Sequence, residues 1–152
     1  MLIEENFTIR APIKNAWDFI TNPEKFASCI PGCEQIKAID EKTFQCIVKQ
    51  KVAGISATFN SNISLTAIDP PYHIESIIKG EDMGKSGTMT QKNILDLKEI
   101  GKEETEIWYG SDLAVVGRIA IFGERIIKAE AKQIGGEFIR SLRGKMEFIE
   151  TA

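Results

Sequence analysis

The sequence predicts an α+β domain in which a seven-stranded antiparallel sheet wraps a long C-terminal helix, with two short helices after the first strand. Three patterns indicate this. Apolar residues at helical spacing follow the first strand directly, period-two alternation runs from Glu34 to Val116 between short turns, and helical periodicity returns after Gly117. The chain has 152 residues without a Gly/Ser/Pro-rich linker, so we expect one domain over residues 1–152.

The first elements are indicated by alternation and by two prolines. Residues 2–9 alternate loosely between apolar and polar side chains and predict a strand. Pro12 suits the first turn of a helix, because its missing N–H has no helical partner there. Asn22-Pro23 ends this helix and begins a second short one through about Ser28. The apolar residues of the first helix are Ile13, Ala16, Trp17 and Ile20.

The middle of the chain predicts six strands. The clearest alternation lies between residues 55 and 67, where apolar residues share one face and Ser, Thr and Asn residues share the other. Because the connections are short, we expect an antiparallel meander. The predicted strands are 34–40, 43–52, 56–69, 72–80, 87–99 and 104–116.

The last part of the chain predicts one long amphipathic helix of about 25 residues. Charged residues occupy much of its other side, and the apolar stripe is wide enough to cover a curved sheet. The apolar residues that recur at steps near three and four are Ile119, Phe122, Ile126, Ile127, Ala131, Ile134, Phe138 and Leu142.

Charge and composition argue against two kinds of function. The chain carries 19 basic and 22 acidic residues, which does not favour nucleic acid binding, because phosphate contacts require a concentrated basic surface. It has one histidine, His73, and no HExxH or paired CxxC motif, so we expect no metal site. We interpret Cys29 and Cys33 as packed thiols, and we expect His73 at the surface without a catalytic partner.

The start of the chain and its cysteine count predict a cytoplasmic protein. Residues 1–10 are acidic where a signal peptide needs a basic region. An odd number of cysteines, three, indicates free thiols in a reducing compartment, which disfavours a Cys29–Cys33 disulfide. The most apolar stretch, 113–123, contains Arg118 and is far shorter than the ~20 apolar residues of a membrane span.

The sheet face turned toward the long helix mixes apolar and polar residues. Each unpaired polar group in a packed core costs ~1–3 kcal/mol, so a closed core would rarely keep Ser61, Ser76, Gln91, Asn93, Tyr109 and Ser111. These groups either orient a ligand in an apolar cavity, or face a solvated mouth and bond one another. The residues expected to line the cavity are Trp17, Phe59, Ser61, Ile63, Ser76, Ile78, Met89, Gln91, Tyr109, Ser111, Leu113, Phe122, Ile126, Ile127 and Ile134.

No buried general acid or base is expected on that face, which argues against an enzyme. Alternation places Asp112 on the opposite side of the last strand, and acid pairs such as Glu4-Glu5 and Glu81-Asp82 stand at strand ends or turns, where solvation is the default.

A gate to the cavity is expected where the last strand meets the long helix. We expect Gly117, Ile119 and Gly123 to form it, with Arg118 and Arg125 able to meet lipid phosphates. If Gly117 is a hinge, Gly117→Ala should slow ligand exchange while leaving the melting temperature nearly unchanged. The alternative is that Gly117 starts the helix and Gly123 allows close packing.

Four segments carry a resemblance to a known family: FTIRAPIKNAW (7–17), IPGCE (30–34), Asp69-Pro70-Pro71 and YGSDLAVVGRIAIFGER (109–125). With them, the chain resembles the START-like and birch-pollen-allergen-like helix-grip superfamily, and more closely the family of the carbon monoxide dehydrogenase G subunit.

The resemblance implies a non-catalytic carrier without a covalent cofactor. Its cavity would hold a hydrophobic lipid-like molecule, a quinone above all. It implies a partner, a carbon monoxide dehydrogenase-like molybdenum hydroxylase, which the protein supports or recruits, and transient contact with the inner face of the membrane. The alternative is a cyclase- or hydrolase-type enzyme that acts on an aromatic or polyketide substrate in the same cavity.

Overall fold

A computed structural model describes residues 1–151 of the chain, with side chains through Glu147. The last residue of the expected domain, Ala152, lies outside the described residues. The elements in chain order are β1 (Leu2–Ile9), α1 (Ile13–Ile20), α2 (Pro23–Ala27), β2 (Cys33–Ala38), β3 (Thr43–Val52), β4 (Ile55–Asp69), β5 (His73–Asp82), β6 (Gly87–Gly101), β7 (Glu104–Gly117), the 3-10 helix η1 (Arg118–Phe122) and α3 (Glu124–Thr151).

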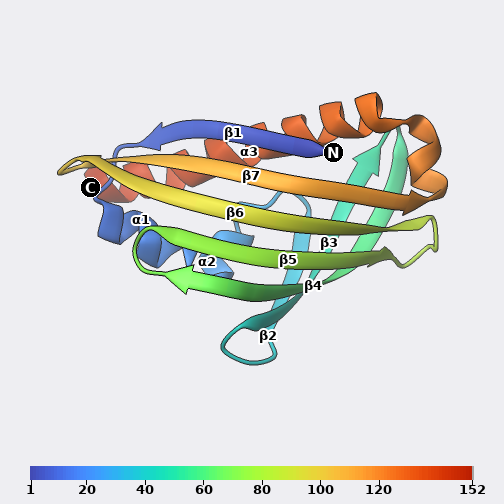
Figure 1. Cartoon of the computed structure of the whole chain (residues 1–152), viewed down its shortest axis with the longest axis horizontal. Coiled ribbons are helices and arrows are strands. Elements are labelled where there is room, and N and C mark those ends of the chain that lie inside the picture. The colour runs from blue at the N-terminus through green and yellow to red at the C-terminus, as the bar shows by residue number, and fades with distance from the viewer. Residues whose placement is uncertain (152) are drawn as a thin grey trace.

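The strands form one antiparallel sheet in the order β1-β7-β6-β5-β4-β3-β2. This confirms the predicted seven-stranded meander, in which the N-terminal strand β1 pairs with the last strand β7. Figure 1 shows β2 and β3 running at a steep angle to β5, β6 and β7, with β4 bending from the direction of β3 into that of β5, as the right-handed twist of sheets produces. The helices α1 and α2 lie at one end of the sheet, and α3 lies behind β1 and β7 (Figure 1).

The two faces of the sheet differ in their contacts. We call the face toward α3 the inner face and the opposite one the outer face. Ile3 of β1 and Leu113 of β7 are buried on the inner face with Ile127 of α3. The helix packs most closely on β1.

The long helix begins later than predicted. Gly117 (φ 108°) and Gly123 (φ 85°) both have a positive φ, and the five residues between them form η1. The predicted continuous helix from residue 119 is therefore wrong at its start, and α3 runs from Glu124 to Thr151. The apolar spacing continues across the break because Ile119 packs against Ala57 and Phe59 of β4.

The apolar core is divided between the two ends of the sheet. At the end that carries α1, the largest cluster joins the sheet to α1 and to the C-terminal half of α3. Two smaller clusters lie toward the end that carries η1: Ile3, Leu113 and Ile127 form one, and Ala57, Phe59 and Ile119 form the other. The buried members of the large cluster include Ile9, Trp17, Leu97, Ile107 and Leu142.

Candidate ligand site between the sheet and the long helix

Polar side chains cross the inner face between these clusters. Ser111 of β7 lies opposite Asn93 of β6, which lies opposite Ser76 of β5. The hydroxyl of Tyr109 donates a hydrogen bond to Oδ1 of Asn93 (3.0 Å), and Nδ2 of Asn93 donates to the Ser76 hydroxyl (3.4 Å). Together with Gln91 of β6 and Ser61 of β4, we call these residues the polar band.

Two members of the polar band are buried hydroxyls with unused hydrogen-bonding capacity. The Ser61 hydroxyl has no hydrogen-bond partner within the described part of the chain, and the Ser111 side chain has the Tyr109 phenol beside it. Leaving such a group unpaired costs ~1–3 kcal/mol. Burial raises the pKa of Tyr109, so its phenol is neutral at pH 7 and remains a hydrogen-bond donor. The band therefore consists of neutral groups, two of which have unused hydrogen-bonding capacity.

The register places most of the predicted lining residues around this band. Ile63 of β4 lies opposite Ile78 of β5, which lies opposite Gln91, so the three form a row across the sheet. Leu113 completes that row from β7. The remaining predicted residues that lie on the inner face are Phe59 and Met89.

The predicted residues outside the sheet lie in different surroundings. Trp17 belongs to the large cluster at the α1 end, where it joins α1 to the sheet. In the long helix Ile127 is buried and Ile134 is half-buried, whereas Ile126 is 42% exposed. Phe122 is half-buried in η1. The helix contact at this end is therefore made by Ile127 more than by Ile126.

Sequence reasoning missed a carboxylate on the inner face. Glu5 of β1 lies directly opposite Tyr109, and its neighbours along the same face, Ile3 and Phe7, are buried. The expectation that Glu5 stands in solvent at a strand end is wrong, because the side chain is half-buried in the middle of β1. The alternation could have indicated this position. Ile3, Phe7 and Ile9 are alternate residues on the inner face of β1, and Glu5 is the residue of the same series between Ile3 and Phe7.

The expectation of a solvated Asp82 is also wrong. Asp82 is buried at the end of β5, opposite Phe59. Its carboxylate accepts hydrogen bonds from the backbone N–H groups of Thr58 (2.8 Å) and Ser86 (3.0 Å). The Ser86 side chain and these N–H groups lower the pKa of Asp82 to about 2. Through these hydrogen bonds Asp82 joins the β5–β6 turn to β4. Because its carboxyl group is ionised at neutral pH, it cannot act as a proton donor there.

The segment predicted as a gate closes the η1 end of the inner face. Ile119 is buried against Ala57 and Phe59, and its N–H donates to the carbonyl of Ser86 (3.2 Å). The surface beside it carries exposed apolar residues, among them Ile121 (81% exposed) and Val116 (65%).

Gly117 is fixed by close backbone packing. A Cβ on Gly117 would lie 2.6 Å from Cα of Gly87 and 2.9 Å from the carbonyl oxygen of Ser86, and its φ of 108° disfavours other residues. The expectation that Gly117→Ala leaves the melting temperature nearly unchanged is therefore wrong. A Cβ on Gly123 would meet nothing within 4 Å, so Gly123 has the space that a hinge needs.

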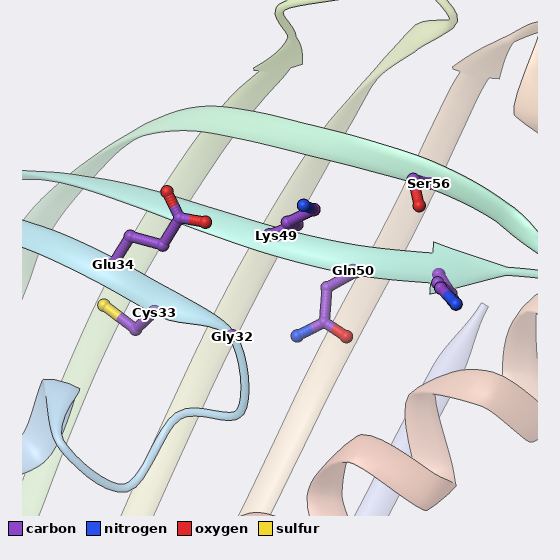
Figure 2. Close-up of a pocket in the computed structure, with 7 residues that line it drawn as sticks. Gly32, Cys33, Glu34, Lys49, Gln50 and Ser56 are labelled. Atoms are coloured by element: carbon purple, nitrogen blue, oxygen red, sulfur yellow. The ribbon is translucent and has the colours of Figure 1, made fainter.

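One pocket lies beside the loop that precedes β2. It has a volume of about 350 Å³ and is lined by residues of β2, β3 and β4, among them Cys33, Glu34 and Gln50. Figure 2 shows Cys33 and Gln50 pointing to one side of the β2–β3 ribbon and Glu34 to the other. The loop is tied to β3, because Nε2 of Gln50 donates to the carbonyl of Pro31 and the N–H of Lys49 donates to that of Gly32 (2.8 Å).

A second pocket, of about 380 Å³, is a hollow on the outer face. This hollow lies at Gly110, which has no side chain. The Trp108 ring lies over Gly110, so a Cβ on that residue would be 2.4 Å from the ring. Neither pocket lies between the sheet and α3. The predicted ligand cavity stays a prediction.

His73 has partners that the sequence did not indicate. Its Nε2 lies 3.0 Å from Oε2 of Glu75, and its Nδ1 is hydrogen-bonded to Oδ1 of Asp96 on β6. The hydrogen bonds to Asp96 and Glu75 raise the pKa of His73. The side chain is 32% exposed on the outer face, away from the polar band, so only the expected lack of an Asp partner is wrong.

The three cysteines form no disulfide bond. Cys29, Cys33 and Cys46 are free thiols, and burial raises the pKa of Cys33 and raises that of Cys46 to about 11. The residues that the structure describes contain no group of three His, Cys, Asp or Glu side chains arranged to hold a metal ion. The same residues include no helix that is both long enough and apolar enough to span a bilayer.

Solved structures share this architecture. A conserved protein from Geobacillus kaustophilus is 22% identical, with a TM-score of 0.90 over 97% of this chain and 95% of its own. A START superfamily protein from Mycobacterium smegmatis is 13% identical (TM-score 0.77, 97% and 98% covered). The Zhui aromatase/cyclase from Streptomyces sp. R1128 is 15% identical (TM-score 0.72, 97% and 93% covered). At these identities the likeness is one of fold, which confirms the START-like helix-grip architecture.

No curated protein matches the chain. The family model for the G subunit of carbon monoxide dehydrogenase (CoxG) matches residues 6–147. This match spans nearly the whole chain and confirms the resemblance carried by the IPGCE loop and the 109–125 segment. The chain therefore belongs to the CoxG family, named for the G subunit of carbon monoxide dehydrogenase.

Proposed function

We propose that this protein is a non-catalytic carrier that holds an elongated apolar molecule between the inner face and α3, with the polar group of that molecule at the polar band. The observation that carries the proposal is the division of the apolar core by the band. Two buried hydroxyls with unused hydrogen-bonding capacity, those of Ser61 and Ser111, lie where a packed core would place apolar groups. A ligand carbonyl or hydroxyl would satisfy them.

The affinity of such a site would come from its apolar walls. Burial of apolar surface contributes ~25 cal/mol per Å² before the costs of ordering the ligand. The walls would come from the row of Ile63, Ile78 and Leu113 and from Ile127 of the helix. The polar band would supply orientation and specificity more than affinity.

Neither of the two pockets described above lies between the sheet and α3, so loading would open this region. We propose that η1 and the first turn of α3 move away from the sheet about Gly123. Exposed Val116 and Ile121, together with Arg118 and Arg125, form a surface at this end that fits transient contact with an anionic membrane, where an apolar ligand is exchanged.

Family membership supports a finer proposal. The ligand is a quinone, and the protein acts with a carbon monoxide dehydrogenase-like molybdenum enzyme, which it serves or recruits at the inner face of the membrane.

The test combines extraction and loading. We expect mass spectrometry of an organic extract of the purified protein to detect an apolar molecule, and equilibrium dialysis to show saturable uptake of decylubiquinone. Ile78→Trp fills the inner face and should reduce uptake, whereas Ile77→Trp, one residue away on the outer face, should not. Absence of both a copurified molecule and any uptake would remove the carrier proposal.

A second candidate is a cyclase- or hydrolase-type enzyme for an aromatic or polyketide substrate. Its support is the placement of the Glu5 carboxylate opposite the Tyr109 phenol on the inner face, where an acid–base pair would act. Recovery of a bound aromatic polyketide unchanged after prolonged incubation would favour the carrier. Conversion that Glu5→Gln abolishes would favour the enzyme.

A further inference from the structure

We infer that Glu5 determines which ligands the site accepts: its carboxylate receives a hydrogen bond from an O–H group of the bound molecule, so that hydroxyl-bearing apolar molecules bind more tightly than ether or carbonyl analogues. The inference rests on the proposed carrier function and adds a preference for one chemical class.

The position of Glu5 is set by the strand register. Antiparallel pairing places Glu5 opposite Tyr109, and residues paired in this way have Cβ atoms about 5 Å apart on the same face. Ile3 and Phe7, two residues to either side, are buried on that face. Glu5 therefore stands at the β1 margin of the polar band, within an otherwise apolar strand face.

The helix that lies over β1 has a glycine between its contacts with this strand. α3 contacts β1 on either side of the level of Glu5: Ile127 packs with Ile3, and Nε of Arg143 donates a hydrogen bond to the carbonyl of Thr8 (3.1 Å). Glu5 lies between these two contacts along β1. The helix segment between them includes Gly135, where an added Cβ would meet nothing within 4 Å. Gly135 therefore contributes no side chain to this segment of the helix.

The chemistry of the carboxylate follows from what surrounds it. An ionised carboxylate only accepts hydrogen bonds. The nearest phenol, that of Tyr109, already donates to Asn93, and no described residue donates to the carboxylate of Glu5. A ligand O–H would satisfy it, whereas an ether or carbonyl oxygen would place a second acceptor beside it. Sites built around such a group discriminate strongly against analogues that lack the donor.

The test compares two probes of nearly equal shape on the full chain, 4-dodecylphenol and its methyl ether 4-dodecylanisole. We expect the wild-type protein to bind the phenol roughly tenfold or more tightly than the ether. Glu5→Gln should bring the two affinities within a few-fold of each other. Glu4→Gln provides the matched control, since it removes the same charge from the adjacent, exposed residue on the outer face and should keep the wild-type ratio.

The outcomes separate this inference from the carrier proposal. Equal affinities for the phenol and the ether in the wild-type protein would overturn the role of Glu5 while leaving the carrier function intact. A preference that survives in Glu5→Gln would overturn it as well. Failure of both probes to bind would instead count against the carrier function itself. The wild-type ratio tests the inference even if Glu5→Gln does not fold.

Discussion

Tyr109 and Asn93 lie on neighbouring strands, offset diagonally on the inner face, and the phenol donates to the amide oxygen at 3.0 Å. This bond uses the phenolic proton and orients the Asn93 amide toward Ser76. Because Asn93 is buried, its amide oxygen would lose its partner if the phenol were removed.

Tyr109→Phe should therefore lower the free energy of unfolding by ~1–3 kcal/mol, the cost of an unsatisfied buried acceptor. Urea denaturation measures the change. Tyr72→Phe is the matched control, because Tyr72 is exposed, and it should have little effect. Equal stability of Tyr109→Phe and the wild-type protein would mean that water reaches Asn93 freely.

Ser61→Ala should stabilise the unliganded protein. The Ser61 hydroxyl is buried without a partner, so its removal relieves a desolvation penalty of ~1–3 kcal/mol. The same substitution at exposed Ser64, on the outer face of β4, should change the free energy of unfolding little. A destabilised Ser61→Ala would show that the hydroxyl has a bound partner in solution.

Alanine substitutions at three glycines should give a graded series of melting temperatures. Gly117→Ala should be the most destabilising, because its Cβ meets the backbone of Gly87 and Ser86. Gly123→Ala has positive φ but no contact, and should cost ~1–2 kcal/mol. Gly144→Ala, in the open on α3, should stabilise by ~0.5–1 kcal/mol. A Gly117→Ala protein as stable as Gly144→Ala would contradict the packing at η1.

The His73 cluster should make stability depend on pH. The hydrogen bonds to Asp96 and Glu75 raise the pKa of His73 in the folded state above its unfolded value of ~6.5. Its contribution is thus fully present below the unfolded pKa and is lost as the pH rises through the folded pKa. The stability difference between wild type and His73→Gln should be larger at pH 5.5 than at pH 8.5. A difference that does not change with pH would rule out the charged pairing, and Asp96→Asn should weaken the dependence.

The strands were predictable because their alternation and the short turns between them are local properties. The same alternation placed Ser61, Gln91, Tyr109 and Ser111 on one face, as the register has them. The break at Gly123 was not predictable from apolar spacing, because Ile119 contacts β4 with the same periodicity that Ile127 uses to contact β1.

Partners that depend on pairing between strands could not be derived from the sequence. His73 contacts Asp96 only because β5 and β6 pair in one particular register. Glu4 and Glu5 were assigned to solvent together, as an acid pair near a strand end, although adjacent residues of a strand point to opposite faces. Its role on the inner face requires the register of β1 with β7.

A site that prefers O–H donors, as inferred for Glu5, has a thermodynamic consequence for a redox-active ligand. The reduced form of a quinone carries O–H groups and the oxidised form carries only carbonyls, so a site that favours donors would hold the reduced form more tightly. By linkage, each tenfold preference would raise the midpoint potential of the bound two-electron pair by about 30 mV. A carrier of this kind would bind the quinone after its reduction and release it after its oxidation. Electrons would then move in one direction without any catalytic group in the carrier.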